Sequence, residues 1–181
     1  MLDLATVQDA GDWDRFRPVG EDTFEQEAFV PWWARHREAL SDLHRDVCEQ
    51  WIFRHWRATR HRWLDPLGLV SHDETFTTDA FLAAVHLHWG GPVDAEFDYD
   101  VFRSNRPDPL PTAMDENWAN GTWVLPPVLL ETPDGVKFHT EEYPDKRYLV
   151  VEGSKRFRWL NALAHRSEET GPHRCYVLKP R

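Results

Sequence analysis

The stretch from Tyr148 to Leu163, YLVVEGSKRFRWLNAL, constrains the fold of this chain more than any other passage. It begins with a β-branched and apolar run, which predicts a strand, and it ends with aromatic residues and leucines at helical spacing. Between the two, Gly153 lets the backbone turn sharply, and Ser154 stands where the N-cap of a helix is expected. The passage therefore predicts a strand, a tight turn and a helix that ends at about His165.

Two further apolar runs predict strands on either side of this passage. WVLPPVLLE is closed by the turn signal Pro133-Asp134-Gly135, and HRCYVLKP lies near the end of the chain. A strand, a helix and a returning strand make a βαβ-like unit. We therefore expect residues 121–181 to form a small α/β module.

The N-terminal half shows helical patterns instead. Pro31 suits the first position of a helix, and apolar residues then recur at steps of three and four, which predicts a helix, with or without a break, to about Leu64. A second helix is expected from Thr78 to the Gly90-Gly91-Pro92 sequence that ends it. We therefore expect residues 1–91 to be mainly helical, and almost wholly so before Gly90.

Residues 92–120 are rich in Pro, Asp and Asn and have few periodic apolar positions, so they are interpreted as an irregular connection. At 181 residues the chain is long enough for one real core. We expect one cooperative α+β unit, in which a helical N-terminal half packs on the C-terminal α/β module. Trp51 and Trp159, two of the ten tryptophans, are expected to be buried in that core.

Composition limits the partners of the chain. It has 31 acidic and 21 basic residues and a net charge of −10, which argues against a nucleic-acid phosphate track as its primary function. The two cysteines have no CxxC spacing, and no signal-peptide pattern precedes them. No stretch approaches the roughly 18 consecutive apolar residues of a membrane span. We therefore expect a cytoplasmic chain with reduced thiols and no membrane partner.

The turn from Glu152 to Arg156 has the residue types of an anion site. The first N–H groups of a helix have no acceptor within it and lie at the positive end of the helix dipole. Lys155 and Arg156 add positive charge there, which suits a phosphate. Glu152 would repel a phosphate unless a divalent cation lay between them, or unless Glu152 paired with Arg156 or Arg158. The alternative is ordinary helix chemistry, in which the two cations are surface residues only.

Residues 121–181 resemble the ParB/sulfiredoxin-like superfamily, whose core reads strand, DG turn, strand ending in (D/E)-G-x-(H/R)-R, helix and strand. PPVLLETPDG, RYLVVEGSKRFRWLNALAH and HRCYVLKP follow that order here. The resemblance implies a module that binds ATP or another nucleotide with Mg²⁺, or another phosphorylated small molecule. It implies that Glu152 acts on the metal or as a catalytic base. The phosphates would lie on Gly153, Ser154, Lys155 and Arg156.

The chain also departs from each branch of that superfamily. Sulfiredoxins have a reactive cysteine directly after the glycine, where this chain has Ser154, so sulfinic-acid reductase chemistry is not expected. ParB proteins add a DNA-binding helix-turn-helix after the module, whereas this chain ends at Arg181, so centromere binding is not expected either. Compared with the small kinases that phosphorylate free serine, Lys155 replaces a histidine, and Glu131 could stand only loosely for a further catalytic glutamate. Phosphotransfer and NTP hydrolysis therefore stay open.

Other candidate groups carry weaker signals. His139 in FHTEEY could present a base or a metal ligand near the turn, although a solvated connection is the preferred interpretation. The basic and aromatic stretch RHWRATRHRW, residues 54–63, could stack on bases, but on so acidic a chain it is interpreted as a solvated helix face with core tryptophans. His86 and His88 are two apart in an expected helix, so they do not share a face, and no metal site is expected.

Different classes of function therefore compete. The first is a ParB/sulfiredoxin-like nucleotide- or phosphate-binding protein, with phosphotransferase or NTPase activity as its expected chemistry. The second is an acidic immunity-type or antitoxin-type protein that neutralises a basic partner protein through its helices and residues 92–120, with the negative charge steering the partner. The third is a turn that serves only as scaffold, with Arg156 paired to a carboxylate and no ligand bound.

Overall fold

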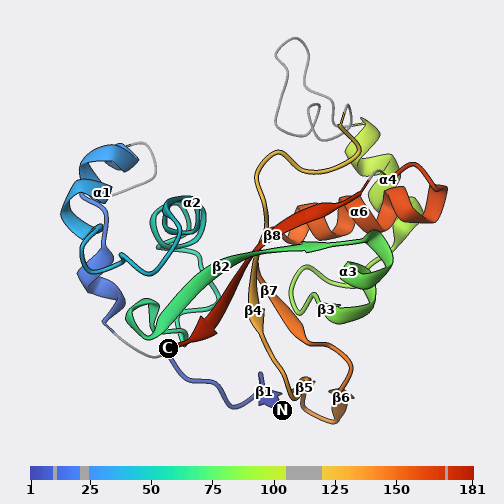
Figure 1. Ribbon diagram of the computed structural model, residues 1–181, viewed down its shortest axis with the longest axis horizontal. Coiled ribbons are helices and arrows are strands. Elements are labelled where there is room, and N and C mark those ends of the chain that lie inside the picture. Colours follow the sequence, from blue (N-terminus) through green and yellow to red (C-terminus); the bar gives the residue numbers. More distant parts are fainter. Residues whose placement is uncertain (10–11, 21–24, 105–119, 170) are drawn as a thin grey trace.

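A five-stranded mixed sheet forms the centre of the computed structural model, which describes residues 1–9, 12–20, 25–104, 120–169 and 171–181 (Figure 1). The strand order is β2-β8-β4-β7-β3. These strands are β2 (Leu69–Phe76), β8 (His173–Pro180), β4 (Val128–Glu131), β7 (Tyr148–Glu152) and β3 (Val85–His86). A smaller sheet in the order β1-β5-β6 consists of β1 (Leu2–Asp3), β5 (Val136–Phe138) and β6 (Glu141–Tyr143).

Helices cover both faces of the central sheet, and the α+β class is confirmed. On one side lie α1 (Phe29–His36), α2 (Arg45–Val47) and the π-helical turn Cys48–Phe53 that continues α2 (Figure 1). On the other side lie α3 (Thr78–Ala84), α4 (Ala95–Ser104) and α6 (Ser154–Arg166). Short 3₁₀ turns occur at Trp13–Phe16 and Pro66–Gly68. None of the helices in the described ranges is both long and apolar enough to cross a membrane.

Strands β4 and β7 of the central sheet bury both of their faces. In β7, Leu149 and Val151 pack with the aromatic side chains of the α1–α2 layer, whereas Val150 packs with α6. In β4, Leu129 packs with α6, and its two neighbours pack with the α1–α2 layer. Strands covered on both faces are apolar at successive positions. For this reason the apolar runs of the sequence predict β4, β7 and β8, which are confirmed together with α6.

Tryptophans fill the layer between the sheet and the N-terminal helices. The indole N–H of Trp32, for example, donates to the Phe16 carbonyl at 2.8 Å, so the buried ring also ties α1 to the 3₁₀ turn Trp13–Phe16. The predicted burial of Trp51 and Trp159 is confirmed, since they are 1% and 0% exposed. Much of the unusual tryptophan content therefore serves the core.

The expectation of an almost wholly helical segment before Gly90 is wrong, because β2 lies there. This strand pairs antiparallel with β8 over its whole length, from Leu69 opposite Pro180 to Phe76 opposite His173. Between its two buried ends, β2 carries half-buried or exposed residues, so LVSHDETF lacks the apolar alternation by which a strand is recognised. Pairing with a buried strand from the other half of the chain decides its conformation.

The helices of this half are also shorter than their patterns suggest. The first is interrupted after His36, and regular helix ends at Phe53, well before Leu64. The second ends at Ala84, and the next two residues form β3, which pairs parallel with β7. Within the connection 92–120 the structure has the helix α4, and residues 105–119 lie outside the described residues.

β7, α6 and β8 do not form the predicted βαβ-like unit, in which the two strands would be parallel. β4 lies between β7 and β8, antiparallel to the first and parallel to the second, so β7 and β8 run in opposite directions. Glu152 of β7 and Tyr176 of β8 both lie beside Val128. The chain therefore leaves β7 and enters β8 near the same end of the sheet, and α6, which joins them, packs on one face of it.

Candidate functional site

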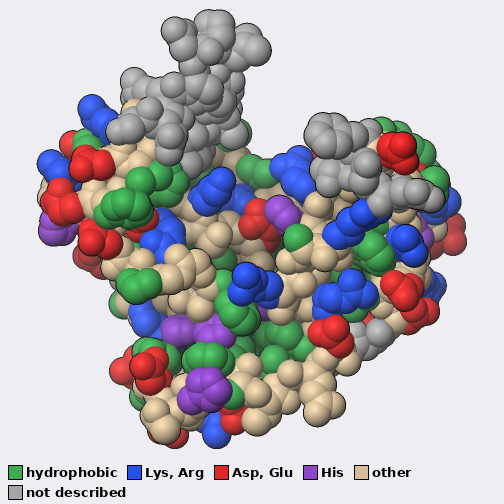
Figure 2. All heavy atoms as spheres, turned by 180° about the vertical axis from the view of Figure 1, so that it is seen from behind, with side chains coloured by type: hydrophobic (Ala, Val, Ile, Leu, Met, Phe, Trp, Pro, Cys, Tyr) green, Lys and Arg blue, Asp and Glu red, His purple; other side chains and the backbone are tan. Residues whose placement is uncertain are grey.

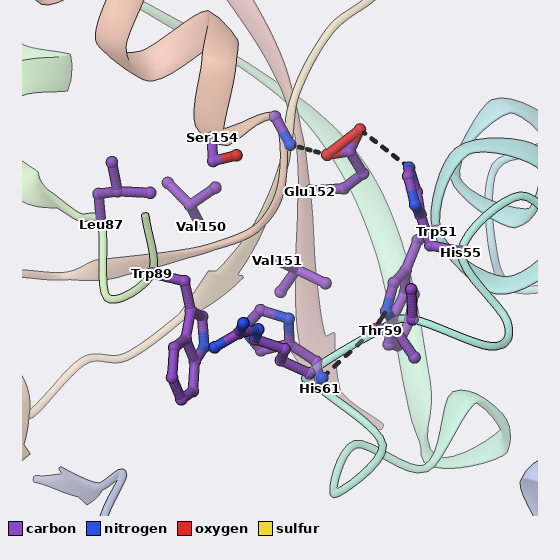
Figure 3. A pocket seen from close by; sticks show the side chains of 13 residues that line it. Trp51, His55, Thr59, His61, Leu87, Trp89, Val150, Val151, Glu152 and Ser154 are labelled. Carbon is purple, nitrogen blue, oxygen red and sulfur yellow. Dashed lines mark hydrogen bonds and ion pairs between the residues drawn. The ribbon is translucent and has the colours of Figure 1, made fainter. Parts of the chain in front are cut away.

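A pocket lies where β7 ends and α6 begins. Its walls come from three separate segments, within residues 51–61, 87–89 and 150–154. Figure 3 shows Ser154 and Glu152 along its upper edge and Trp89 and His61 along its lower edge. Its volume of about 210 Å³ is below the roughly 300–1,000 Å³ of sites that enclose drug-sized ligands. The pocket therefore has room for one ring or one phosphate-sized group at depth, and the rest of a larger ligand would lie outside.

Gly153 sets the direction in which α6 starts. Its φ of 110° lies in the left-handed region, and a Cβ atom there would be only 2.6 Å from Pro127 Cβ. This glycine is the N-cap, which corrects the prediction for Ser154, because Ser154 is already the first helical residue. The first hydrogen bond of α6 runs from the Phe157 N–H to the Gly153 carbonyl at 2.9 Å. The N–H groups of residues 154–156 therefore have no acceptor within the helix.

Arg156 points into the protein and does not line the pocket. Its Nη1 donates to Gln50 Oε1 at 2.8 Å and to the carbonyls of Leu125 and Pro126 at 2.6 and 3.0 Å. Its Nη2 donates to Glu152 Oε1 at 3.0 Å, and only 13% of the side chain is exposed. The sequence leaves open whether Arg156 binds a phosphate or pairs with Glu152, and in the structure it pairs with Glu152. The guanidinium joins α6 to the helical half of the chain and is not directed at an anion in the pocket.

Glu152 lines the pocket with both carboxylate oxygens in use. One accepts from Arg156 and lies 3.7 Å from His55 Nε2, and the other accepts from the Gly153 N–H. Burial raises the pKa of Glu152, but His55, Arg156 and the Gly153 N–H lower it by more, so the pKa lies below its usual value. A carboxylate with a lowered pKa is a poor general base near neutral pH. Because the Arg156 guanidinium at 3.0 Å already balances its charge, Glu152 does not fit the role of a Mg²⁺ ligand either.

The remaining residues predicted for the site lie apart from one another. Lys155 is exposed in the first turn of α6 and makes no ion pair with any residue that the structure describes. Glu131 lies at the other end of β7 from Glu152 in the pairing of β4 with β7. His139 has a φ of 53° in the turn between β5 and β6, because FHTEEY forms a hairpin. The structure therefore brings residues 152–154 to the pocket, and neither Glu131 nor His139 lines it.

The opposite wall of the pocket is formed by residues that the sequence patterns do not assign to the site. His55, Arg60 and His61 belong to the basic and aromatic stretch interpreted from the sequence as a solvated helix face. Trp89 follows β3, and the guanidinium carbon of Arg60 lies 4.5 Å from the centre of its ring. Basic, acidic, histidine and apolar side chains meet near the middle of the face in Figure 2. The alternation of cations with aromatic residues in 54–63 is the signal that could have found this wall.

His61 is the most unusual polar residue of this wall. It is 5% exposed, yet its Nε2 has no hydrogen-bond partner among the residues that the structure describes. Burial, and to a smaller extent His88, lowers the pKa of His61 to about 4, so the imidazole is neutral at neutral pH. Leaving a buried polar atom without a partner costs about 1–3 kcal/mol. The pocket wall thus includes an unsatisfied hydrogen-bonding atom.

The burial of His61 predicts a loss of stability in acid. Its pKa falls from 6.5 in the unfolded chain to about 4 in the folded protein. Between these values the unfolded state binds more protons, so the free energy of unfolding decreases as the pH falls through this window. His61 contributes up to about 3 kcal/mol to this decrease in the free energy of unfolding. Denaturant unfolding near pH 6.5 and near pH 4 should show the loss, and His61→Gln should reduce it by that share.

The exposed His139 provides the control for this experiment. His139→Asn should retain the full acid-induced loss of stability, because that side chain is exposed and an asparagine tolerates its left-handed backbone. His86, whose pKa burial also lowers to about 4, continues to contribute in both variants. An identical pH dependence in wild type and His61→Gln would contradict a buried neutral imidazole at position 61.

Neither a metal centre nor a known relative indicates the function of this pocket. Within the described ranges, no group of three or more His, Cys, Asp or Glu side chains is arranged to hold a metal ion. Comparisons of the chain with protein-family models, with curated proteins and with solved structures find no match. The resemblance of residues 121–181 to ParB/sulfiredoxin-like proteins therefore stays a prediction, and function is inferred from the pocket itself.

Proposed function

We propose that this protein binds a phosphorylated small molecule, such as a nucleotide, with the phosphate at the start of α6. The observation that carries the proposal is that Ser154, the first residue of α6, lines the pocket while the N–H groups of residues 154–156 have no acceptor within the helix. Such N–H groups, at the positive end of the helix dipole, are donors for an anion. The resemblance to ParB/sulfiredoxin-like phosphate turns supports the same position.

Cations around the pocket favour an anionic ligand over a neutral one. Lys155 is exposed in the first turn of α6, and Arg60 lies on the opposite wall. The negative charge of Glu152 is offset by Arg156, with which it is paired at 3.0 Å. A cation in the first turn of a helix opposes the helix dipole and costs roughly 0.3–1 kcal/mol. A bound anion would offset the unfavourable interaction between the Lys155 charge and the helix dipole.

The proposal concerns binding and does not include phosphotransfer or NTP hydrolysis. Glu152, the predicted catalytic residue, has a lowered pKa and is paired with Arg156. We therefore give Glu152 and Arg156 a positioning role: together they hold the turn that aims the start of α6 at the pocket. Gly153 and Ser154 supply the turn and the first N–H group, and Lys155 supplies the nearby positive charge.

Lys155→Glu separates ligand binding from folding. An acidic residue in the first turn of a helix is favourable, so the variant should be as stable as wild type, or more stable by about 0.3–1 kcal/mol. It should nevertheless weaken binding by about tenfold or more, because a negative charge then lies beside the bound anion. Calorimetric titration with ATP, ADP, CTP, GTP and inorganic phosphate, each with and without Mg²⁺, measures the affinities.

Lys179→Glu is the matched control. Lys179 is an exposed lysine of β8 that does not line the pocket, so the same change of net charge there should leave binding unchanged. Thermal melting gives an independent readout, because a ligand at 100 times its Kd stabilises the folded state by about 2.7 kcal/mol. Failure of all five ligands to bind wild type at millimolar concentration would refute the proposal.

The net charge of −10 favours a second candidate function, the binding of a basic partner protein by an immunity-type or antitoxin-type protein. Part of the surface predicted for this role, residues 105–119, lies outside the described residues. Next to it, α4 carries Phe97 at 65% exposure, a large apolar side chain of the kind that interfaces bury. The pocket has no part in this alternative, so the two candidate functions are tested separately.

A further inference from the structure

The lower edge of the pocket has features that a phosphate site does not need. His61 and Trp89 lie there, opposite Ser154 in the view of Figure 3. His61 is 5% exposed and its Nε2 lacks a hydrogen-bond partner among the described residues. Trp89 is a large aromatic side chain that is nevertheless 37% exposed. A phosphate held at the start of α6 accounts for neither feature.

Both residues are held in place by their surroundings. The backbone N–H of His61 donates to Thr59 Oγ1 at 3.2 Å, and the same hydroxyl oxygen accepts from the Trp51 indole N–H at 3.2 Å. The Arg60 guanidinium lies over the Trp89 ring, 4.5 Å from its centre. An aromatic surface and a hydrogen-bonding atom that are fixed before the ligand arrives reduce the entropic cost of binding.

We propose that this edge of the pocket selects a ligand with a flat unsaturated ring, which packs on Trp89 and the Arg60 guanidinium that lies over it, and forms a hydrogen bond with His61 Nε2. The ligand is then a phosphorylated planar heterocycle, and His61 is a specificity-determining residue. The inference rests on the proposed function, because the phosphate at α6 orients the ring. The pocket volume of about 210 Å³ has room for one ring at depth, so a monophosphate, whose phosphate lies outside that depth at the start of α6, is sufficient.

The protonation state of His61 favours a ring over a second anionic group. Because burial lowers its pKa to about 4, the imidazole is neutral near neutral pH. Its Nε2 is a donor in one tautomer and an acceptor in the other. Ring nitrogens and exocyclic amino or keto groups of a heterocycle match one tautomer or the other, whereas a neutral imidazole supplies no positive charge to balance a second phosphate.

The test compares ligands that share a phosphate and differ in the ring. Calorimetric titration uses AMP, CMP, GMP and UMP as planar-ring probes, ribose 5-phosphate as the probe without a ring, and adenosine and cytidine as the probes without a phosphate. At least one nucleotide should bind wild type about tenfold or more tightly than ribose 5-phosphate does. His61→Phe keeps a flat ring but lacks Nε2. It should therefore weaken the binding of that nucleotide by about tenfold and leave the affinity for ribose 5-phosphate unchanged.

Stability of the ligand-free variant separates a specificity role from a structural one. Because Nε2 has no partner among the described residues, His61→Phe should melt at or above the wild-type temperature, whereas a structural histidine would lower it. Trp89→Ala is a second variant, at a partly exposed position, which should remove the nucleotide preference even if His61→Phe fails to fold. His72→Phe changes an exposed histidine of β2 that does not line the pocket, so it should leave the affinities for the nucleotide and for ribose 5-phosphate unchanged.

The outcomes distinguish the ring subsite from the phosphate site. Equal affinity of wild type for the nucleotides and ribose 5-phosphate would overturn the ring subsite and leave the phosphate site in place. The same conclusion would follow if His61→Phe and Trp89→Ala both retained the wild-type preference. If adenosine or cytidine bound wild type while no phosphorylated probe did, the proposed function would be rejected and the ring subsite supported.

Discussion

Arg156→Ala should lower the free energy of unfolding by about 3 kcal/mol, because it breaks a largely buried ion pair and leaves the other partner uncompensated. Arg156 is 13% exposed and Glu152 is 23% exposed, and the two are 3.0 Å apart. The same guanidinium also donates to Gln50 and to two backbone carbonyls. Without it, the Glu152 carboxylate and these acceptors lose their donor in a place that water reaches poorly.

Denaturant unfolding at neutral pH measures this effect. Arg54→Ala is the control, since Arg54 is 59% exposed and 3.8 Å from Glu49, and its loss should change stability by no more than about 0.5 kcal/mol. Adding Glu152→Gln to Arg156→Ala should restore part of the loss by removing the unpaired carboxylate. An Arg156→Ala variant as stable as the Arg54→Ala control would mean that the guanidinium is free for a ligand, as the phosphate-turn hypothesis for Arg156 requires.

Gly153→Ala should destabilise the protein by roughly 3 kcal/mol, from backbone strain and overpacking together. The residue has a φ of 110°, and an added Cβ would lie 2.6 Å from Pro127 Cβ and 3.1 Å from Arg156 Nε. The new methyl group therefore pushes on the segment that Arg156 also holds. Because the start of α6 would move with it, the affinity for phosphorylated ligands should fall as well.

Gly91→Ala separates the two contributions. Gly91 has a φ of 74°, but no atom lies within 4 Å of an added Cβ, so the substitution carries backbone strain without a clash. We expect it to cost about 1 kcal/mol. Denaturant unfolding of both variants gives the difference. Equal losses in Gly153→Ala and Gly91→Ala would show that Pro127 and its neighbours move aside, and that the turn is less constrained than the structure indicates.

Short-range signals were sufficient for the turn and the elements on either side of it. The β-branched run of β7, the glycine after it and the helical spacing from Ser154 are properties of consecutive residues, and β7 and α6 lie at those positions. β2 could not be recognised in the same way. Its sequence is mostly polar, and its conformation depends on pairing with β8, which begins almost a hundred residues later.

The candidate site shows the same division. Residues Glu152, Gly153 and Ser154, which the sequence assigned to a phosphate turn, line the pocket. The direction of Arg156 was left open by the sequence, because its acceptors Gln50, Leu125 and Pro126 belong to other segments. His61 and Trp89 were not assigned to the site, because no local pattern shows that residues 54–63 and the end of β3 face the start of α6.

By itself, the sequence determined the α+β class, the strand–glycine–helix turn and the presence of unpaired N–H groups at the start of α6, because each depends on residues that are neighbours in the chain. Only the tertiary structure decided that Arg156 turns inward and that His61 and Trp89 stand opposite Ser154. Those positions result from buried hydrogen bonds and from packing between distant segments on the two sides of one sheet, which no local periodicity records.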